Sequence, residues 1–248
     1  MKRMRLTHFN LKIGRHLQKP ETKKYYNEKV FSEIAPRYDF ITRVLSLWND
    51  AAWKRYLIES IPGKNHSVCL DLACGTGDIT FLLAEKNTGG KVYGLDITEA
   101  MLKIARMRNS YKNVSFINQD MCQIEFDGET VDIVTGGYAL RNAPDLNMVI
   151  REIYRVLKPG GYAAILDFSK PPGKILPKLE YWILKIWAGF WGLLLHRNHE
   201  VYSYIAESLK VYPDRGALRI LLERQGFSIK KSNLYFFGIT QFLLLQKE

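Results

Sequence analysis

The sequence has few cysteines, and they are not arranged to crosslink a fold. Cys69, Cys74 and Cys122 are an odd number without a Cys-x-x-Cys pair, which argues for a reducing compartment and against a structural zinc site. The hydrophobic share of 47% and the charged share of 25% exclude collagen-like, disordered and disulfide-scaffold proteins. A chain of 248 residues fits one α/β domain whose core needs no disulfide or metal.

Acidic residues are scarce at the start of the chain. Residues 1–24 contain eight Lys or Arg and one acid, Glu21, and so carry +7 of the net charge of +11. We expect residues 1–24 to be a basic tail and residues 25–248 to form a single domain of nearly balanced charge. A basic tail favours contact with an anionic membrane surface, because each Lys or Arg near it gains about 1 kcal/mol. The tail lacks the apolar stretch of a signal peptide, whereas a transit peptide stays open.

Long hydrophobic runs and histidine clusters are also missing. The most apolar segment, residues 179–195, is interrupted by Glu180 and Lys185 and is too short to cross a hydrocarbon core of about 30 Å. Two interpretations compete, a core helix packed on a sheet or an amphipathic interface that faces a bilayer, and the basic tail favours the second. The pair His196-x-x-His199 is more typical of solvated polar residues than of a metal site, so we expect no metal.

The pattern of the remaining chain predicts an α/β fold. Residues 25–63 are rich in aromatic residues, end at Pro62-Gly63 and predict an N-terminal helical cap. Strands then alternate with helices, which predicts a doubly wound, Rossmann-like, mostly parallel seven-stranded sheet. Residues 169–212 are a helical insertion, and two last strands separated by little more than Gly238 predict an antiparallel hairpin at one edge. The expected strands are 67–72, 91–97, 114–118, 131–135, 162–168, 228–237 and 240–245, and the expected helices are 78–86, 98–109, 146–157 and 214–225.

A glycine-rich loop, Asp71-Leu72-Ala73-Cys74-Gly75-Thr76-Gly77-Asp78, joins the first expected strand to a helix. In a doubly wound sheet, ligands bind in the crevice at the carboxyl ends of the strands, so this loop lines a pocket. A nicotinamide dinucleotide needs Gly-x-Gly-x-x-Gly, but the residue three beyond Gly77 is Thr80. Asp71 and Asp78 also place negative charge where a pyrophosphate would lie. The loop therefore favours a cationic ligand that contains a ribose, such as S-adenosylmethionine.

Acidic residues at the ends of later strands support a cationic nucleoside. Asp96 ends the second strand, 19 residues beyond Gly77, where a carboxylate accepts hydrogen bonds from both ribose hydroxyls. Asp120 follows the third strand, where it can hold an adenine amino group. The expected cofactor-binding residues are Asp71, Ala73, Gly75, Thr76, Gly77, Asp96, Ile97, Met101, Asp120 and Met121.

Longer motifs resemble those of one methyltransferase family. They are Tyr38-Asp39, Leu140-Arg141-Asn142, Arg155-Val156-Leu157-Lys158-Pro159-Gly160-Gly161, Asp167-Phe168-Ser169-Lys170-Pro171 and Tyr204-Ile205-Ala206-Glu207-Ser208. From about residue 28 to its end, the chain resembles the ubiquinone and menaquinone biosynthesis C-methyltransferases, which are class I S-adenosylmethionine-dependent enzymes. The resemblance implies C-methylation of a demethylated polyprenyl benzoquinol or naphthoquinol. It also implies a cytoplasmic protein peripheral to the inner face of the membrane, or on the matrix side in mitochondria, that forms a homodimer or joins a quinone-synthesis complex.

The resemblance also implies which residues act on the acceptor. A hydroquinone ring becomes nucleophilic when an adjacent hydroxyl ionises, and Arg141 can stabilise that oxyanion because it stays charged when desolvated. Asn142 can orient a hydroxyl, and Tyr38 or Asp39 can bond the other ring oxygen. Asp167 is either a base or a cap of its strand.

The insertion at residues 169–212 is expected to form, with the cap, an apolar lid that holds the acceptor in line with the methyl donor. Three departures from the family's usual pattern leave the acceptor open. They are Ile41-Thr42 where Met-Asn is typical, Asp50 where histidine is typical and Asp167 where glutamate is typical. The alternative acceptor is another small phenol or natural product.

Two further interpretations compete with this one. The net charge of +11 is also typical of an RNA methyltransferase. The fourth expected strand, however, ends in Gly136-Gly137-Tyr138-Ala139-Leu140 and lacks the Pro-Pro-aromatic group that resembles base-amine methylases, and no cysteine stands where it can attack a pyrimidine. We therefore expect no nucleic-acid partner. A cofactor-binding scaffold without chemistry is disfavoured because the glycine loop, Asp96 and Arg141 are all present.

Overall fold

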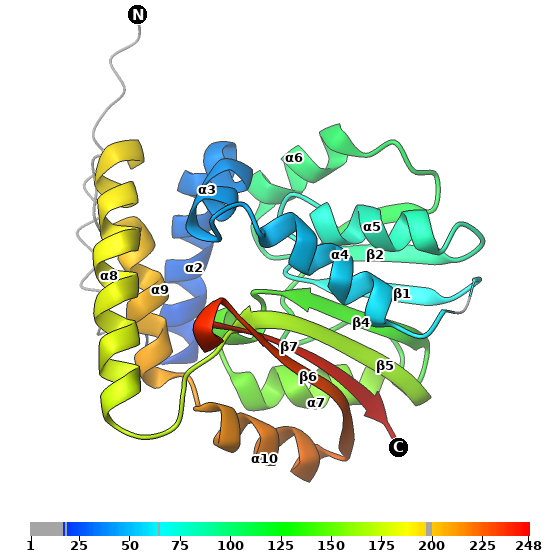
Figure 1. Ribbon diagram of the computed structural model, residues 1–248. Coiled ribbons are helices and arrows are strands. Elements are labelled where there is room, and N and C mark those ends of the chain that lie inside the picture. The colour runs from blue at the N-terminus through cyan, green and yellow to red at the C-terminus, as the bar shows by residue number, and fades with distance from the viewer. Residues whose placement is uncertain (1–16, 18, 64, 197–199) are drawn as a thin grey trace, which may run out of the picture.

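The computed structural model describes residue 17 and residues 19–63, 65–196 and 200–248, and its centre is one seven-stranded sheet (Figure 1). The strands are β1 (Val68–Leu72), β2 (Lys91–Asp96), β3 (Val114–Asn118), β4 (Val131–Gly137), β5 (Leu157–Phe168), β6 (Phe227–Tyr235) and β7 (Thr240–Lys247). Their order is β3-β2-β1-β4-β5-β7-β6. Strands β1 to β5 are parallel, and β7 is antiparallel to both of its neighbours. The predicted doubly wound, mostly parallel sheet is confirmed.

The parallel register brings the ends of four strands to one edge of the sheet. Leu72 at the end of β1 pairs with Leu95 of β2 and with Gly136 of β4, and Asp96 pairs with Asn118 of β3. The loops that follow these strands therefore open at the same edge, which is where ligands bind in folds of this type.

Helices cover both faces of the sheet, which is why its central strands are nearly continuous apolar runs. They are α4 (Asp50–Ser60) and α5 (Asp78–Lys86) on one face, α7 (Leu146–Val156) and α10 (Arg215–Gln225) on the other, and α6 (Glu99–Arg108) beside β2 and β3 (Figure 1). Leu57 of α4 and Leu83 of α5 pack with Val92 in one core. Ile150 of α7 packs with Leu70 in the other.

The later strands differ from the sequence predictions at their ends. Strand β5 begins at Leu157 instead of residue 162, and its pairing with β4 shifts where residues 158–161 bulge. Gly160 in this bulge has a φ of +76°, a conformation that glycine adopts without strain. Strands β6 and β7 form the predicted antiparallel hairpin at the edge of the sheet, joined by the short helix η3 (Phe236–Gly238).

The cap is built from two segments far apart in the sequence. Its elements are α2 (Pro20–Ile34), η1 (Ala35–Arg37), α3 (Tyr38–Leu45), α8 (Ile175–His196) and α9 (Glu200–Val211), which lie beyond the strand ends, at the left and top of Figure 1. Tyr26, Ile41 and Ala188 belong to a separate apolar core between them. Proline at the first position favours a helix start at residue 20, so the last five residues of the segment expected as a tail are helical. Residues 1–16 and 18 of that segment lie outside the described residues.

Helix α8 exposes an apolar stripe along its length. Leu184 and Ala188 are buried, Leu184 in the core beside α9 and Ala188 in the core of the cap, so one face of the helix packs as a core helix does and the other does not. The exposed face, here named the α8 stripe, consists of Ile175, Leu176, Leu179, Trp182, Ile183, Ile186, Trp187, Phe190, Leu193 and Leu194. Within the part of the chain that the structure describes, no helix is long and apolar enough to span a membrane. The side chains of His196 and His199, the pair examined as a metal site, lie outside the described ones.

Candidate active site

The glycine loop turns sharply because several of its residues have a left-handed backbone. Ala73, Gly75 and Gly77 have φ values of +49°, +55° and +93°. Gly77 is the N-cap of α5, and a Cβ atom there would lie 2.9 Å from the ring of Phe81. A larger residue at this position would strain the backbone and displace that ring. The turn places the loop against two adjoining cavities.

The first, the strand-end cavity, measures about 620 Å³ including its open mouth. It is lined by seven of the predicted cofactor residues, Ala73, Gly75, Asp96, Ile97, Met101, Asp120 and Met121. Asp96 is fixed in place, because its Oδ2 accepts the Gly75 N–H at 2.8 Å and its Oδ1 accepts the Thr98 N–H at 2.7 Å. Burial raises the pKa of Asp96 although these hydrogen bonds lower it. A hydroxyl-bearing or cationic ligand would therefore stabilise the ionised form.

Asp120 has a partner that the sequence did not reveal. Lys24 of α2 lies 2.8 Å from Asp120 Oδ2, and Asp120 Oδ1 accepts the N–H of Cys122 at 2.9 Å. Lys24 itself lines the strand-end cavity. A helix start at Pro20 was the signal in the sequence that this lysine belongs to the folded domain.

Three amide oxygens of the strand-end cavity are buried and accept no hydrogen bond from the described residues. They are Asn27 Oδ1, Gln119 Oε1 and Asn142 Oδ1. The orientation of two of these amides is set, because Asn27 Nδ2 donates to the carbonyl of Asn142 at 2.6 Å and Asn142 Nδ2 donates to that of Tyr138 at 2.7 Å. Unpaired buried acceptors cost about 1–3 kcal/mol each. With Asp96 they suit a ligand of positive charge and many donors, so S-adenosylmethionine fits the cavity.

The second, the loop cavity, adjoins the other side of the glycine loop. Asp71 and Thr76 line it together with Ala73, which lines both cavities, whereas Gly77 lines neither. Asp71 accepts hydrogen bonds from the hydroxyls of Thr80 at 2.7 Å and Thr135 at 2.8 Å. Burial raises the pKa of Asp71 to about 7 although these hydrogen bonds lower it. The carboxyl group therefore titrates near neutral pH.

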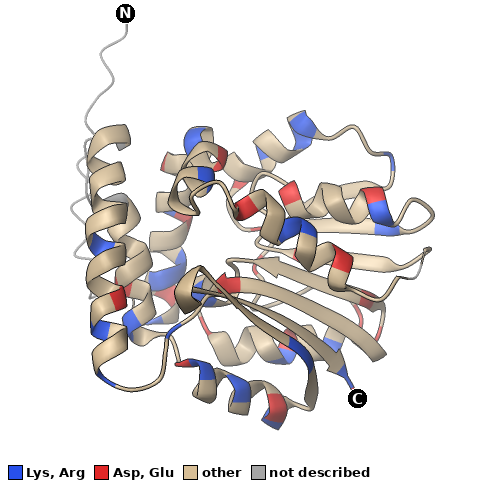
Figure 2. Cartoon of the chain, in the orientation of Figure 1, with Lys and Arg blue, Asp and Glu red and all other residues tan. Residues whose placement is uncertain are grey.

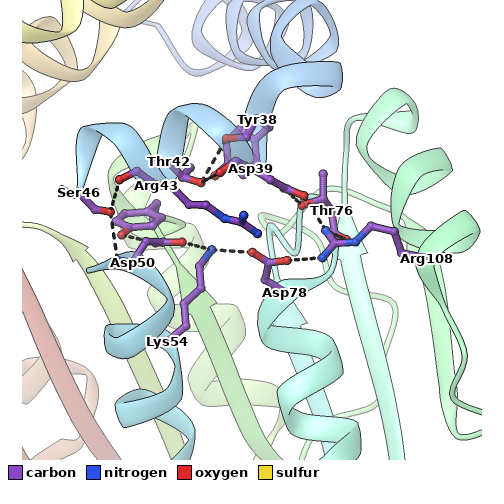
Figure 3. Close-up of polar contacts among 11 residues, drawn as sticks. Tyr38, Asp39, Thr42, Arg43, Ser46, Asp50, Lys54, Thr76, Asp78 and Arg108 are labelled. Carbon is purple, nitrogen blue, oxygen red and sulfur yellow. Dashed lines mark hydrogen bonds and ion pairs between the residues drawn. The ribbon is translucent and has the colours of Figure 1, made fainter. Parts of the chain in front are cut away.

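Charged side chains tie the cap to the glycine loop (Figure 3). Asp39 of α3 accepts from the Thr76 hydroxyl at 2.5 Å and lies 2.9 Å from Arg108 of α6. Arg108 also lies 2.8 Å from Asp78 and donates to the carbonyl of Thr76 at 3.1 Å. Asp39 therefore contacts the loop. No local feature of the sequence indicates that Arg108 lies beside this loop.

The same row of charges continues into α4. Lys54 Nζ lies 2.6 Å from Asp50 and 3.1 Å from Asp78. Asp50 also accepts a hydrogen bond from the Tyr138 hydroxyl at 2.8 Å. Burial alone would lower the pKa of Lys54, but Asp50 and Asp78 reverse this and hold it above its usual value. The i, i+4 spacing of Asp50 and Lys54 was the available signal for this pair.

The third, the cap cavity, measures about 1230 Å³ including its open mouth and is lined mostly by apolar and aromatic side chains of the cap. Phe31, Tyr38, Tyr138 and Asn142 line both this cavity and the strand-end cavity. These residues form a shared wall. A group bound in one cavity can therefore meet a group bound in the other.

Arg141 is buried at the wall of the cap cavity, with 3% of its surface exposed. Its guanidinium carbon lies 5.0 Å from the ring centre of Phe168 and 5.6 Å from that of Tyr204. Its Nε lies 3.8 Å from Asp167 Oδ1 and donates no hydrogen bond to any described residue. The guanidinium is thus charged, desolvated and only partly paired, which is how a donor for an oxyanion is held.

The η2 turn (Leu140–Asn142) that presents Arg141 is held from two sides. Lys23 of α2 donates to the carbonyls of Arg141 at 2.9 Å and Ala143 at 2.6 Å. Burial, together with the charge of Arg141, lowers the pKa of Lys23 to about 8. From β5, Asp167 accepts the Arg141 N–H at 2.9 Å and the Phe168 N–H at 2.7 Å. Asp167 therefore caps this turn, whereas the roles expected for it were a base or a cap of its own strand.

The predicted acceptor residues do not all meet in the cap cavity. Tyr38, Arg141 and Asn142 line it, whereas Asp39 and Asp167 do not. Tyr204 belongs to the family motif at residues 204–208, but the motif alone does not indicate a role for it. Tyr204 is buried, lines the cap cavity, and its hydroxyl makes no hydrogen bond with the described residues.

Comparison with known proteins decides the family. A profile of the ubiE/COQ5 methyltransferase family matches residues 19–244. The chain belongs to this family. It is therefore an S-adenosylmethionine-dependent methyltransferase, as its motifs predicted.

Named relatives of this methyltransferase cover most of its length. A 2-phytyl-1,4-naphtoquinone methyltransferase of Thermosynechococcus vestitus is 34% identical over 226 residues, which are 89% of this chain and 98% of the relative. A demethylmenaquinone methyltransferase of Thermus thermophilus is 35% identical over 209 residues, with coverages of 84% and 95%. That of Geobacillus stearothermophilus is 33% identical over 223 residues, with coverages of 88% and 95%.

Solved structures share the fold of this methyltransferase at lower identity. The methyltransferase in complex with the Haloferax volcanii Trm112 activator has a TM-score of 0.65 at 18% identity, over 87% of this chain and 96% of that one. A SAM-dependent methyltransferase from Aquifex aeolicus has a TM-score of 0.57 at 18% identity, with coverages of 79% and 89%.

Proposed function

We propose that this methyltransferase transfers a methyl group to a ring carbon of a reduced, demethylated polyprenyl naphthoquinol, in menaquinone-type biosynthesis. The observation that carries the proposal is the shared wall, because it places a large apolar cavity directly against a cavity suited to the methyl donor. The names of the relatives support the choice of a naphthoquinone ring. The corresponding benzoquinol of ubiquinone biosynthesis is the acceptor to compare with it.

The cofactor assignments follow the cavities. Asp96 would hold the ribose hydroxyls, with Ile97 and Met101 packed around the nucleoside, and Asp120 with Met121 would hold the adenine. The remaining part of the cofactor is its amino-acid end, which derives from methionine. The glycine loop would hold this end with Asp71, Ala73, Gly75, Thr76 and Gly77. Bound S-adenosylmethionine supplies an electrophilic methyl group on a positively charged sulfur.

The residues of the cap cavity would activate the acceptor. A ring carbon attacks when the adjacent hydroxyl has lost its proton, and Arg141 would stabilise the resulting oxyanion. Asn142 Oδ1, which accepts no hydrogen bond from the described residues, would accept one from a ring hydroxyl, and the hydroxyl of Tyr38 would bond the other ring oxygen. In place of a direct contact with the ring, Asp39 would brace Thr76 of the glycine loop, and Asp167 would hold the backbone of Arg141.

We also propose peripheral contact between the α8 stripe and the inner, anionic face of the membrane. Ile183 and Trp187 belong to the stripe and also line the cap cavity, so a polyprenyl tail could pass from the bilayer to the ring site between them. Figure 2 shows large parts of α8 without charge, and Lys174 and Lys178 are exposed near its start. Assembly as a homodimer or in a quinone-synthesis complex stays a prediction.

Vesicle flotation tests the membrane contact. The protein should float with anionic phosphatidylglycerol vesicles, less so at high salt, and poorly with neutral phosphatidylcholine. Ile186→Lys, in the stripe, should weaken flotation several-fold, whereas Ile220→Lys, an equally apolar exposed position on α10, should not. Equal flotation of the two variants would reject the α8 stripe as the contact.

Methyl transfer tests the function. Radiolabelled methyl from S-adenosylmethionine should enter a reduced demethylated naphthoquinol more readily than the oxidised quinone, the matching benzoquinol or a small phenol. Label that enters RNA, or a small phenol in preference to either quinol, would overturn the proposal. The quinones of cells that lack the protein should contain a precursor that misses one methyl group.

A further inference from the structure

We infer that Lys54 binds the carboxylate at the amino-acid end of S-adenosylmethionine, a role that rests on the proposed function. The loop cavity around Lys54 measures about 300 Å³ including its mouth. It shares Tyr38, Ala73, Gly137 and Tyr138 with the strand-end cavity. A ligand that fills the strand-end cavity can therefore extend along the glycine loop into the loop cavity.

The chemistry of the two cavities indicates which end of the cofactor lies in which. The strand-end cavity offers Asp96, Asp120 and unpaired amide oxygens, which match the hydroxyls and amine of a nucleoside. Lys24, the one Lys or Arg among its described lining residues, is already paired with Asp120 at 2.8 Å. A carboxylate would meet mainly acceptors there. The loop cavity is left for the amino-acid end.

Lys54 is the one Lys or Arg among the described residues that line the loop cavity. Its side chain is 8% exposed, and its Nζ lies between Asp50 at 2.6 Å and Asp78 at 3.1 Å (Figure 3). An ammonium group has three N–H donors. Two of them suffice for these carboxylates, so one donor is available to a ligand.

The two flanking carboxylates do not depend on Lys54 alone. Asp50 accepts a second hydrogen bond from Tyr138 at 2.8 Å, and Asp78 has a second ion pair with Arg108 at 2.8 Å. Lys54 can therefore turn toward a ligand carboxylate without leaving either acid unpaired. Asp78 and Asp71 also line the loop cavity, so the cavity holds acids for the α-ammonium group of the same end. A zwitterion needs both signs of charge, and the loop cavity has both.

Ligands that differ only at the amino-acid end, here called the arm, test the inference on the unaltered protein. Calorimetry with S-adenosylhomocysteine, its carboxyl methyl ester and 5′-methylthioadenosine, which lacks the arm, separates the subsites. Loss of one charge-assisted contact should weaken binding of the ester roughly 10- to 100-fold relative to S-adenosylhomocysteine. An ester that binds as well as its parent overturns the role of Lys54. If the protein binds none of the three ligands, the proposed function itself is wrong.

A substitution then assigns the contact to Lys54. Lys54→Met should weaken S-adenosylhomocysteine roughly 10- to 100-fold, remove the difference between the ester and its parent, and leave 5′-methylthioadenosine unchanged within about twofold. The control is Lys86→Met, because Lys86 donates to the carbonyls of Ile58 and Ile61, both at 2.7 Å, and does not line the loop cavity.

Two outcomes of the substitution would contradict the inference. S-Adenosylhomocysteine affinity could stay unchanged, or it could fall by the same factor as that of 5′-methylthioadenosine. Because Lys54→Met removes a positive charge beside the buried Asp50, the double variant Lys54→Met with Asp50→Asn is measured beside it and should show the same selective loss. If neither variant folds, the ester comparison on the unaltered protein decides.

Discussion

The strand-end cavity and the cap cavity share a wall but are built in opposite ways. The strand-end cavity forms mainly from segments that follow β1 to β4, with Lys24, Asn27, Phe31 and Tyr38 of the cap on one side, and its polar atoms are mainly acceptors. The cap cavity forms largely from α2 and α3, which precede the sheet in sequence, and from α8 and α9, which lie between β5 and α10, and its lining is mostly apolar. The first is therefore positioned mainly by the sheet, whereas the second depends more on how distant helices pack.

This difference separates binding of the methyl donor from activation of the acceptor. Asp96 is held by backbone N–H groups of its own edge of the sheet. Arg141 is held by Lys23, a residue 118 positions away, and by contacts with Ser208 and Asp167. Substitutions in the strand-end cavity should therefore change the affinity for the cofactor and not the use of the acceptor. Substitutions in the cap cavity should do the reverse.

The largest expected effect breaks the acceptor side alone. Arg141→Gln should lower kcat about 100- to 1000-fold, as for loss of an oxyanion donor, while S-adenosylhomocysteine affinity stays within about twofold. Because a buried Asp167 without its partner is destabilising, the double variant Arg141→Gln with Asp167→Asn controls for the lost charge pair. Steady-state turnover assays measure kcat, and calorimetry measures the affinity for S-adenosylhomocysteine. Parallel losses in both would mean that the two cavities are not separable.

The opposite result is expected for the cofactor side. Asp96→Asn should weaken S-adenosylhomocysteine about 10- to 100-fold, because a carboxylate bonded to ribose hydroxyls is replaced by a neutral amide, with the acceptor KM little changed. Asp132→Asn is the matched control, since Asp132 accepts a backbone N–H from Val68 at 2.8 Å at the other edge of the sheet. Equal cofactor affinity in the two variants would reject the ribose assignment.

The sheet and the glycine loop could be predicted from sequence because their signals are local. The alternation of strands and helices, the glycines of the loop and the carboxylates Asp71, Asp96 and Asp120 are all read from short stretches of chain. The error at β5 also has a local cause. The strand begins five residues before its predicted start, because residues 158–161 bulge without leaving the sheet. The Pro-Gly-Gly sequence at this place is more typical of a loop.

The cap could not be predicted to the same degree, because its contacts join residues far apart. Lys23 was assigned to a tail, although its ammonium is buried against carbonyls of the η2 turn. Asp39 was expected at the acceptor, but Thr76 and Arg108 bind it instead. The α8 segment had two competing interpretations, since periodicity alone does not tell which face of a helix finds a partner.

A smaller effect is expected from pH, through Asp71. Burial raises the pKa of Asp71 from 3.8 to about 7, so the folded protein binds one more proton than the unfolded chain between these values, and stability from this group falls as pH rises through that window. The α-ammonium group of S-adenosylhomocysteine would favour the ionised carboxylate, so the affinity for this ligand should fall about tenfold from pH 8 to pH 6. Calorimetry across this range should give a flat profile for Asp71→Asn. The same slope in both proteins would assign the titration to another group.

The smallest expected effect sharpens the acceptor side. Tyr204→Phe removes a buried hydroxyl that makes no hydrogen bond with the described residues and lines the cap cavity. Its loss should not lower the melting temperature, because no partner is left unpaired, but it should raise the acceptor KM about fivefold if the hydroxyl bonds a ring oxygen, worth about 1 kcal/mol. Tyr212→Phe removes a similarly buried, unpaired hydroxyl outside that cavity and should change neither quantity. If both substitutions raise KM alike, packing of the cap and not a contact with the ring explains the effect.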